Sequence, residues 1–72
     1  MEIQLNGETT QVSEDLDLTT LIANLGLTGK RIAVEVNLEI VPRGQHAQYR
    51  LQPGDKIEVV VAIGGGDGGF TL

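Results

Sequence analysis

The fold is decided by the stretch Lys56-Ile57-Glu58-Val59-Val60-Val61-Ala62-Ile63, which is followed directly by Gly64-Gly65-Gly66. The stretch is rich in β-branched residues, alternates apolar and charged residues at its start, and then becomes almost wholly apolar. This pattern predicts a strand in the interior of a sheet. Because side chains alternate along a strand, one face is expected to carry Ile57, Val59, Val61 and Ile63, and the other Glu58, Val60 and Ala62.

The glycines that follow the strand have no side chain that could pack, donate a hydrogen bond or bind a metal. The segment Gly64 to Gly66 can therefore act only through its backbone or through a terminal carboxylate. Glycine-rich segments behave as flexible chains. We therefore expect a folded domain over residues 1–63 and a flexible, glycine-rich tail over residues 64–72.

Length, charge and composition narrow the classes of function. With 72 residues the chain forms one small domain, in which a catalytic cleft would be hard to fit. The sequence has no cysteine, which excludes disulfides and thiolate metal sites and suits the reducing cytoplasm. Ten acidic and five basic residues give a net charge of −5, which disfavours nucleic acids and anionic membrane surfaces as partners. No signal sequence or membrane-spanning stretch is recognisable.

The first half of the chain predicts a hairpin and a helix. Asn6-Gly7 is the strongest short hairpin signal, and it separates Met1–Leu5 from Glu8–Val12. Asp17 is placed to cap a helix, and Gly26 is placed to end it in the left-handed conformation. The helix is expected to bury one apolar stripe, made of Leu18, Leu21, Ile22 and Leu25.

The segments between the helix and the final strand are shorter. A half-buried strand is expected over Ile32–Val36, and Glu39–Pro42 is expected to form a short strand or arm at a sheet edge. Arg43–Gln48 is expected to form a helical turn or loop, and Tyr49–Leu51 a brief strand. Gln52–Asp55 contains Pro-Gly and predicts a turn.

This order of elements predicts the α+β class and a β-grasp fold, a mixed sheet of four to five strands covered by one main helix. The final strand then lies parallel to the first in the sheet interior. The uncovered face would present Ala33, Val60 and Ala62 among charged residues. Such a modest apolar patch fits a protein-docking surface, and scattered exposed apolar residues of no special role fit it equally well.

Other polar residues suggest no catalytic or metal site. His46 has neither a cysteine nor a second histidine to share a metal with, so we expect it to be a packing or surface residue. No pair of carboxylates is placed for acid and base catalysis. Arg43 and Arg50 are expected to pair with surface carboxylates, and pairing with a partner is the alternative.

Four segments carry a resemblance to a known family: Val34-Glu35-Val36-Asn37, Glu39-Ile40-Val41-Pro42-Arg43, Gly54-Asp55-Lys56-Ile57-Glu58 and Ala62-Ile63-Gly64-Gly65-Gly66. In this order and spacing they resemble the ThiS/MoaD family of ubiquitin-like sulfur carriers, most closely its thiamine-pathway branch, over residues 1–66. Leu38 departs from the family pattern, which often has glycine after Asn37, so a tight turn there is less strongly expected.

The resemblance implies a carrier rather than an enzyme. In this family a C-terminal glycine carboxylate is adenylated with ATP by an E1-like adenylyltransferase of the ThiF type and is then converted to a thiocarboxylate. A ThiG-type thiazole synthase takes the sulfur. By resemblance Gly66 would carry the sulfur, and Gly64 and Gly65 would present it. No catalytic residue, bound cofactor or metal is then expected on the chain itself.

The segment after Gly66 departs from that pattern. Asp67-Gly68-Gly69-Phe70-Thr71-Leu72 continues the chain, so Gly66 ends in an amide that cannot be adenylated as an acid. Three explanations stay open. A peptidase removes Asp67 to Leu72, the segment is an addition or a fused downstream reading frame, or Gly68-Gly69 is the working pair once Phe70 to Leu72 are lost. Gly66 is preferred because its separation from the end of the final strand matches that of the terminal glycine in the family.

Two alternatives to the thiazole branch also stay open. One is a molybdopterin-type or other thiocarboxylate carrier. The other is a non-covalent β-grasp docking module whose glycine tail is a tether only.

Overall fold

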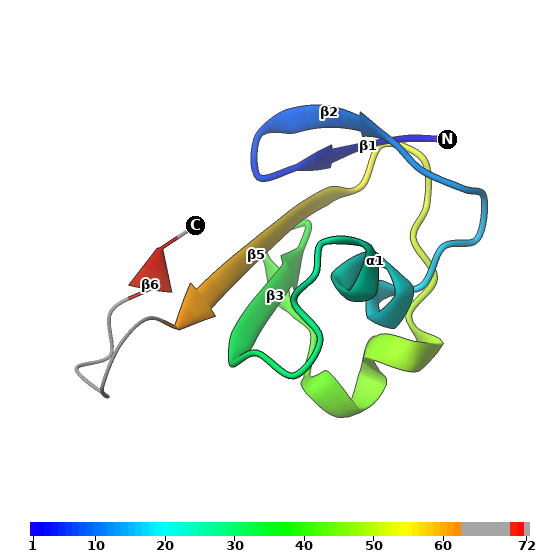
Figure 1. The fold of residues 1–72 in the computed structure, drawn as a ribbon. Helices are drawn as coiled ribbons and strands as arrows, with labels where there is room; N and C mark the ends of the chain where they lie inside the picture. The colour runs from blue at the N-terminus through cyan, green and yellow to red at the C-terminus, as the bar shows by residue number, and fades with distance from the viewer. Residues whose placement is uncertain (63–69, 72) are drawn as a thin grey trace.

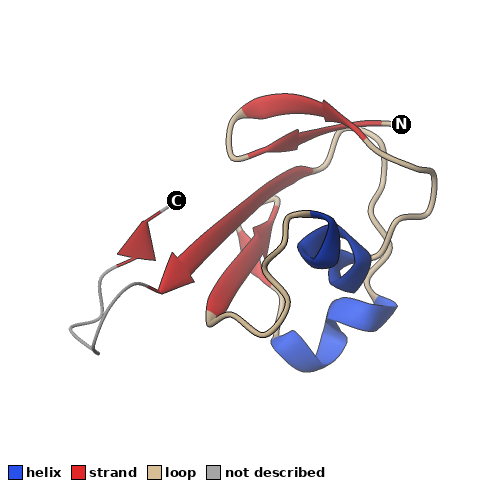
Figure 2. Ribbon diagram, viewed as in Figure 1, coloured by secondary structure: helices blue, strands red, loops and turns tan. Residues whose placement is uncertain are grey.

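The computed structural model describes residues 1–62 and 70–71. A twisted sheet carries the helices on one face, and the hairpin of β1 and β2 lies at one end of the sheet (Figure 1, Figure 2). In chain order the elements are β1 (Glu2–Leu5), β2 (Glu8–Gln11), α1 (Leu18–Asn24), β3 (Ile32–Val36), β4 (Glu39–Ile40), the 3₁₀ helix Arg43–Gln48, β5 (Lys56–Ala62) and β6 (Phe70–Thr71).

The described strands form a mixed sheet in the order β2-β1-β5-β3-β4, with β6 pairing to β5. β1 and β5 run parallel, whereas the other pairs are antiparallel. The final long strand therefore lies in the middle of the sheet, beside the first strand, as its apolar sequence predicts. The β-grasp prediction, with one main helix over one face, is confirmed.

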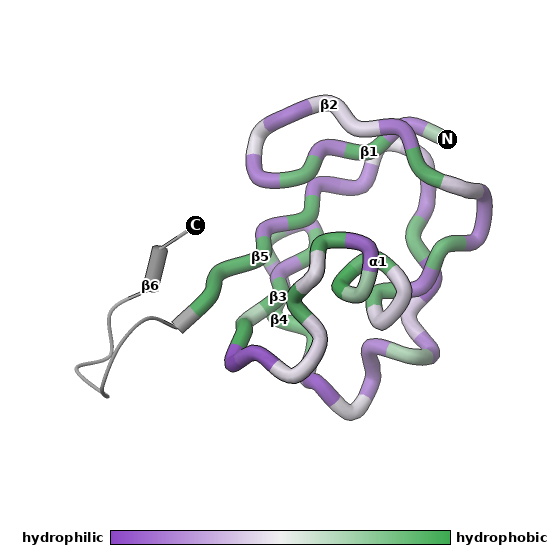
Figure 3. Tube along the Cα trace, in the orientation of Figure 1, coloured by the Kyte–Doolittle hydropathy of each residue, from purple (hydrophilic) through white to green (hydrophobic). Residues whose placement is uncertain are grey.

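The core lies between the sheet and α1. Figure 3 shows the alternation of hydrophobic and hydrophilic residues along β1 and the start of β5, which turns one side of each strand toward this core. The buried apolar side chains are Ile3, Leu16, Leu18, Leu21, Ile22, Val34, Val36, Val41, Leu51, Ile57 and Val59.

The helix is defined at both ends by the predicted residues. Asp17 accepts a hydrogen bond from the backbone N–H of Thr20 at 2.6 Å, which caps the first turn. At the other end Gly26 has φ +74°, and the N–H of Leu27 donates to the carbonyl of Ile22 at 3.0 Å. This is the glycine-terminated helix end predicted from the sequence.

The expected apolar stripe of α1 is one residue too long. Leu18, Leu21 and Ile22 are buried, but Leu25 is 39% exposed. Leu25 is the C-cap residue rather than a member of the helix, so the chain is already turning away from the core there. A 3.6-residue period extended past the last helical turn explains the wrong prediction.

The cap at Asp17 makes stability depend on pH. Its hydrogen bonds from Thr20 lower the pKa of the carboxyl group below its usual value, and Arg50 adds a smaller effect in the same direction. The ionised carboxylate therefore stabilises the folded state. This contribution is fully present above the pKa of about 4 in the unfolded chain, and it is lost as the pH falls through the lower pKa in the folded chain. Asp17→Asn keeps a capping oxygen but removes the titration. We expect urea midpoints of the wild type to fall more steeply than those of the variant between pH 5 and pH 2.5, and equal slopes would contradict this assignment.

The segment before β5 forms no strand of its own. Tyr49–Leu51 was expected to be a brief strand, but only one isolated bridge forms there, between Arg50 and Asp17. Leu51 is buried, and its N–H donates to the carbonyl of Leu16 at 2.8 Å. The segment thus packs against the start of the helix and not against the sheet, whereas Arg43–Gln48 forms the expected helical turn.

A two-residue turn joins β3 to β4, despite the leucine in it. Asn37 has φ 51° and Leu38 has φ 71°, and the flanking residues Val36 and Glu39 are register partners. Both central residues thus have the positive φ of a type I′ hairpin turn. The tight turn thus forms although Leu38 made it less strongly expected, because the ladder and the contacts of Asn37 hold Leu38 in a conformation that costs a non-glycine residue about 1 kcal/mol.

Leu38→Gly should therefore stabilise the protein. Leu38 is 88% exposed, so little buried surface is lost when its side chain is removed. We expect a gain of about 0.5–1 kcal/mol in the free energy of unfolding, from urea denaturation, after the entropy cost of glycine is subtracted. Leu38→Ala is the matched control, because alanine loses the side chain but keeps the strain. A gain for alanine as large as for glycine would contradict this reading.

Candidate functional site: the root of the glycine tail

The predicted reactive segment begins at Gly64, two residues after Ala62, the last residue of β5. Gly64, Gly65 and Gly66 lie outside the described residues, so the structure neither places them nor tests their predicted role. It does describe the strand that leads to them and the surfaces around that strand.

β5 is held on both sides. β3 pairs with it over five residues, from Ile32↔Val61 to Val36↔Ile57, and β1 pairs with its first two residues. The side chain of Asn6 extends this second contact, because its Oδ1 accepts a hydrogen bond from the Val59 N–H at 2.9 Å. The root of the tail is therefore a firmly anchored strand.

A polar network fixes the start of the same strand. The Asn37 side chain accepts from the Lys56 N–H and donates to the Asp55 carboxylate, both at 3.0 Å. The other carboxylate oxygen of Asp55 accepts from the Gln52 N–H at 2.9 Å, which closes the predicted Pro-Gly turn. Burial raises the pKa of the nearby Tyr49 phenol, and the charge of Asp55 adds to the effect, so Tyr49 stays neutral.

The face of the sheet away from α1 carries the predicted docking residues. Ala33 and Val60 are register partners on β3 and β5 and are both half-buried, so the structure brings these two together. Ala62 belongs to β5, but its side chain lies outside what the structure describes. We call the surface formed by Ala33, Glu35, Ile40, Glu58 and Val60 the outer face.

The outer face is more apolar and more acidic than the sequence predicted. Ile40 is 70% exposed and is the register partner of Glu35, which in turn is the register partner of Glu58. Ile40 was not predicted for this surface. The two-residue turn at Asn37-Leu38 was the available signal, because it pairs Ile40 with Glu35 on the same face of the sheet. Like charges directly opposite each other on neighbouring strands are destabilising. Glu35 and Glu58 also border a small hollow of about 100 Å³, which Lys56 lines as well.

β6 occupies part of the free edge of β5. Its residues pair in antiparallel register with the end of β5, as Val61↔Thr71 and Ala62↔Phe70. Because β3 already holds Val61 on one side, β6 lies on the other side, beyond the end of β1. Phe70 and Thr71 thus lie alongside the end of β5 (Figure 1).

The remaining candidate residues have structural roles. His46 is buried, and its Nε2 lies 2.9 Å from the Val41 carbonyl, so it is a packing residue as expected. Among the described residues, Arg43 and Arg50 donate to the backbone carbonyls of Lys30 and Asp15, and no pairing with a described carboxylate is seen. Within residues 1–62 and 70–71 no cluster of three His, Cys, Asp or Glu residues could hold a metal. No helix in the described ranges is both long and apolar enough to cross a bilayer.

Comparisons with known proteins agree with this architecture. Residues 2–66 match the ThiS family. The chain is 33% identical over 66 residues to the sulfur carrier protein ThiS of Escherichia coli K12, a match that covers 92% of this chain and all of that protein. It is 42% identical over 66 residues to a thiazole synthase of Paramagnetospirillum magneticum, and there it spans only 20% of the relative's length.

A solved structure has the same fold. The crystal structure of the thiamine biosynthesis protein ThiS from Geobacter metallireducens superposes with a TM-score of 0.79 at 29% sequence identity, covering 92% of this chain and 100% of that one. The family match over residues 2–66 and the similarity to the whole length of the Escherichia coli protein lead to one conclusion. The chain belongs to the ThiS family.

Proposed function

We propose that this chain is a sulfur carrier of thiamine biosynthesis and that the carboxylate of Gly66 holds the sulfur. The observation that carries this proposal is the extent of the family match, which ends on the last of the three glycines that follow β5. The match to the whole of Escherichia coli ThiS supports the same end point. Gly66 is therefore favoured over Gly69 as the reactive residue.

The chemistry proceeds in two displacements. A free carboxylate is a poor electrophile, because its charge is delocalised and oxide is a poor leaving group. A carboxylate oxygen of Gly66 attacks the α-phosphorus of ATP and releases pyrophosphate, which leaves an acyl-adenylate. Hydrosulfide delivered by a partner then attacks the carbonyl carbon of Gly66 and displaces AMP, which leaves a thiocarboxylate. An E1-like adenylyltransferase of the ThiF type supplies the catalysis, so this chain is a carrier and not an enzyme.

The described structure supports the role of presentation. The final strand is anchored by β3, by β1 and by the Asn6 side chain, and the pairing with β3 reaches Val61. Three residues of fully extended chain span at most roughly 10 Å, which is enough to carry a carboxylate from the domain into a partner's nucleotide site. Glycine has no Cβ to clash in a narrow channel.

The outer face is the proposed docking surface for the partners. Its half-buried Ala33 and Val60, together with the exposed Ile40, supply apolar contact area beside the paired carboxylates. Ala62, the third residue predicted for this surface, follows Val60 by two positions on β5. An acidic and apolar surface fits a partner that presents basic and apolar groups, because complementary charges steer association.

The thiazole branch is favoured among the possible acceptors. The thiazole synthase of Paramagnetospirillum magneticum contains a segment that is similar to this chain, so in that relative the carrier-like segment and the synthase share one polypeptide. A ThiG-type thiazole synthase is therefore the proposed recipient of the sulfur, in preference to a molybdopterin-type acceptor.

The segment Asp67 to Leu72 must be removed before the carboxylate can react. We propose that a peptidase hydrolyses the Gly66–Asp67 peptide bond, because the carbonyl carbon of Gly66 otherwise belongs to an amide. The removed segment includes β6, which pairs with only two residues of β5.

A growth experiment tests the function. In a strain that lacks its own ThiS and co-expresses the activating enzyme and thiazole synthase of this chain's host, residues 1–66 should restore growth without thiamine. Residues 1–64 are the matched control and should fail, because the folded domain is retained but Gly65 and Gly66 are absent. Equal growth with residues 1–64, or no growth with residues 1–66 when Escherichia coli ThiS and its own partners succeed, would contradict the proposal.

A further inference from the structure

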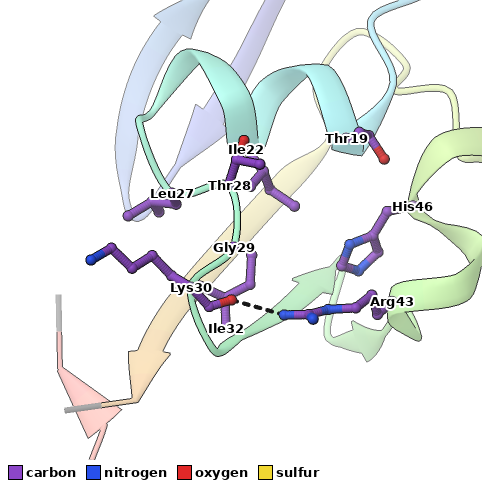
Figure 4. A pocket seen from close by; sticks show the side chains of 9 residues that line it. All are labelled: Thr19, Ile22, Leu27, Thr28, Gly29, Lys30, Ile32, Arg43 and His46. Atoms are coloured by element: carbon purple, nitrogen blue, oxygen red, sulfur yellow. Dashed lines mark hydrogen bonds between the residues drawn. The ribbon is translucent and has the colours of Figure 1, made fainter. Parts of the chain in front are cut away.

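A second hollow lies on the helix side of the sheet, away from the outer face. It has a volume of about 220 Å³ and is enclosed by α1, the loop that follows α1, the start of β3 and the 3₁₀ helix. Figure 4 shows Leu27 and the Lys30 side chain at one side of it and Arg43 and His46 at the other. We call it the basic pocket.

The walls of the basic pocket are largely apolar. Ile22 is buried in the core, and Leu27 and Ile32 are partly buried against it. Together they give the pocket an apolar surface that still contacts solvent. An aliphatic side chain placed there would remove this surface from water at a gain of roughly 25 cal/mol per Å².

The rim of the pocket carries only positive charge. Lys30 and Arg43 line it, and none of its lining residues is acidic, although the whole chain has a net charge of −5. The Arg43 Nη2 donates to the Lys30 carbonyl at 2.8 Å, which holds the guanidinium at the rim.

The size of the pocket limits its occupant. Pockets for cofactors and small-molecule ligands usually have volumes of about 300–1,000 Å³, so a hollow of about 220 Å³ suits a single side chain better. In many protein interfaces a few side chains that are buried in pockets of the partner supply most of the binding energy. The positive rim selects a partner segment with a carboxylate beside that anchor.

We infer that the basic pocket receives an apolar side chain of a partner protein and that the positive charges of Lys30 and Arg43 attract a neighbouring carboxylate of the same partner. Ile32 is the register partner of Val61, so a protein bound here lies near the end of β5. The outer face remains free, because it is on the opposite side of the sheet. The chain thus offers two separate docking surfaces, the outer face with its two glutamates and the basic pocket.

The pocket can be tested without the sulfur chemistry. We propose titrating the ¹⁵N-labelled chain with N-acetyl-Leu-Glu-amide and, as the uncharged match, N-acetyl-Leu-Gln-amide. Saturable shift changes are expected in the amides of residues 27–32 and 43–46, with the glutamate peptide binding at least about fivefold more tightly, because only its carboxylate meets the rim. Neither ATP nor an activating enzyme is present, so failure here is distinct from failure of the proposed carrier function.

Substitutions of the basic residues test whether they cause the preference for the glutamate peptide. Lys30→Gln leaves its backbone carbonyl in place for Arg43 and should reduce the preference for the glutamate peptide, and the double change with Arg43→Gln should abolish it. Lys56→Gln, on the opposite side of the sheet, should leave the preference unchanged. Equal binding of both peptides, shift changes centred on the outer face, or the same shifts with acetate alone would overturn the inference.

Discussion

Residues 1–66 should acquire a thiocarboxylate when incubated with the activating enzyme, ATP and a sulfur donor, whereas residues 1–72 should not. The two chains share the same anchored β5 and differ only after Gly66. In the longer chain the Gly66 carbonyl is part of an amide, so no oxygen is available to attack ATP as a carboxylate. Intact-protein mass spectrometry detects the exchange of one oxygen for one sulfur, and the expected contrast is all or none.

The chain ending at Gly69 is the control for that experiment. It also ends in two glycines, Gly68-Gly69, but lies three residues further from β5. We expect little or no thiocarboxylate on it, because the carboxylate would overshoot the partner's nucleotide site. Sulfur incorporation into residues 1–69 equal to that of residues 1–66, or into uncleaved residues 1–72, would contradict the assignment of Gly66.

Leu18→Ala should cost about 3 kcal/mol of folding stability, whereas Leu25→Ala should cost less than about 1 kcal/mol. Leu18 is fully buried between α1 and the sheet, so its removal leaves a cavity. Leu25 is 39% exposed and lies at the C-cap. Guanidinium denaturation of both variants measures the difference, with matched m-values as the check on two-state unfolding. Similar losses for the two leucines would show that the helix buries a different face.

The helix ends were predicted better from the sequence than the buried face of the helix. The cap at Asp17 and the glycine end at Gly26 were predictable, because each depends on the chemistry of one residue next to its own helix terminus. Leu25 was mispredicted because periodicity does not say where the last turn stops. The capping residues therefore predicted the helix ends more accurately than the apolar period predicted the buried residues.

The sheet was predictable where its sequence is strongly patterned. The interior position of β5 and its parallel pairing with β1 followed from the apolar composition of the final strand. The turn at Asn37-Leu38 was underestimated because its support comes from residues far away in the sequence, chiefly the contacts of Asn37 with Asp55 and Lys56. Local propensity alone cannot include such long-range contacts.

The surfaces around the tail were only partly predictable. Ala33 and Val60 were expected on one face from alternation, and they are register partners. The basic pocket was not foreseen, because Leu27, Ile32 and Arg43 come from three segments that only the tertiary fold brings together. β6 was not foreseen either, since a two-residue strand after a glycine-rich segment has no periodicity to reveal it.

The most direct test of the central claim is intact-protein mass spectrometry of this chain purified from its native host during growth that requires thiamine synthesis. We predict a chain that ends at Gly66, with a fraction in which one carboxylate oxygen is replaced by sulfur. Full-length, unmodified chain alone, with the activating enzyme and thiazole synthase both present, would contradict it.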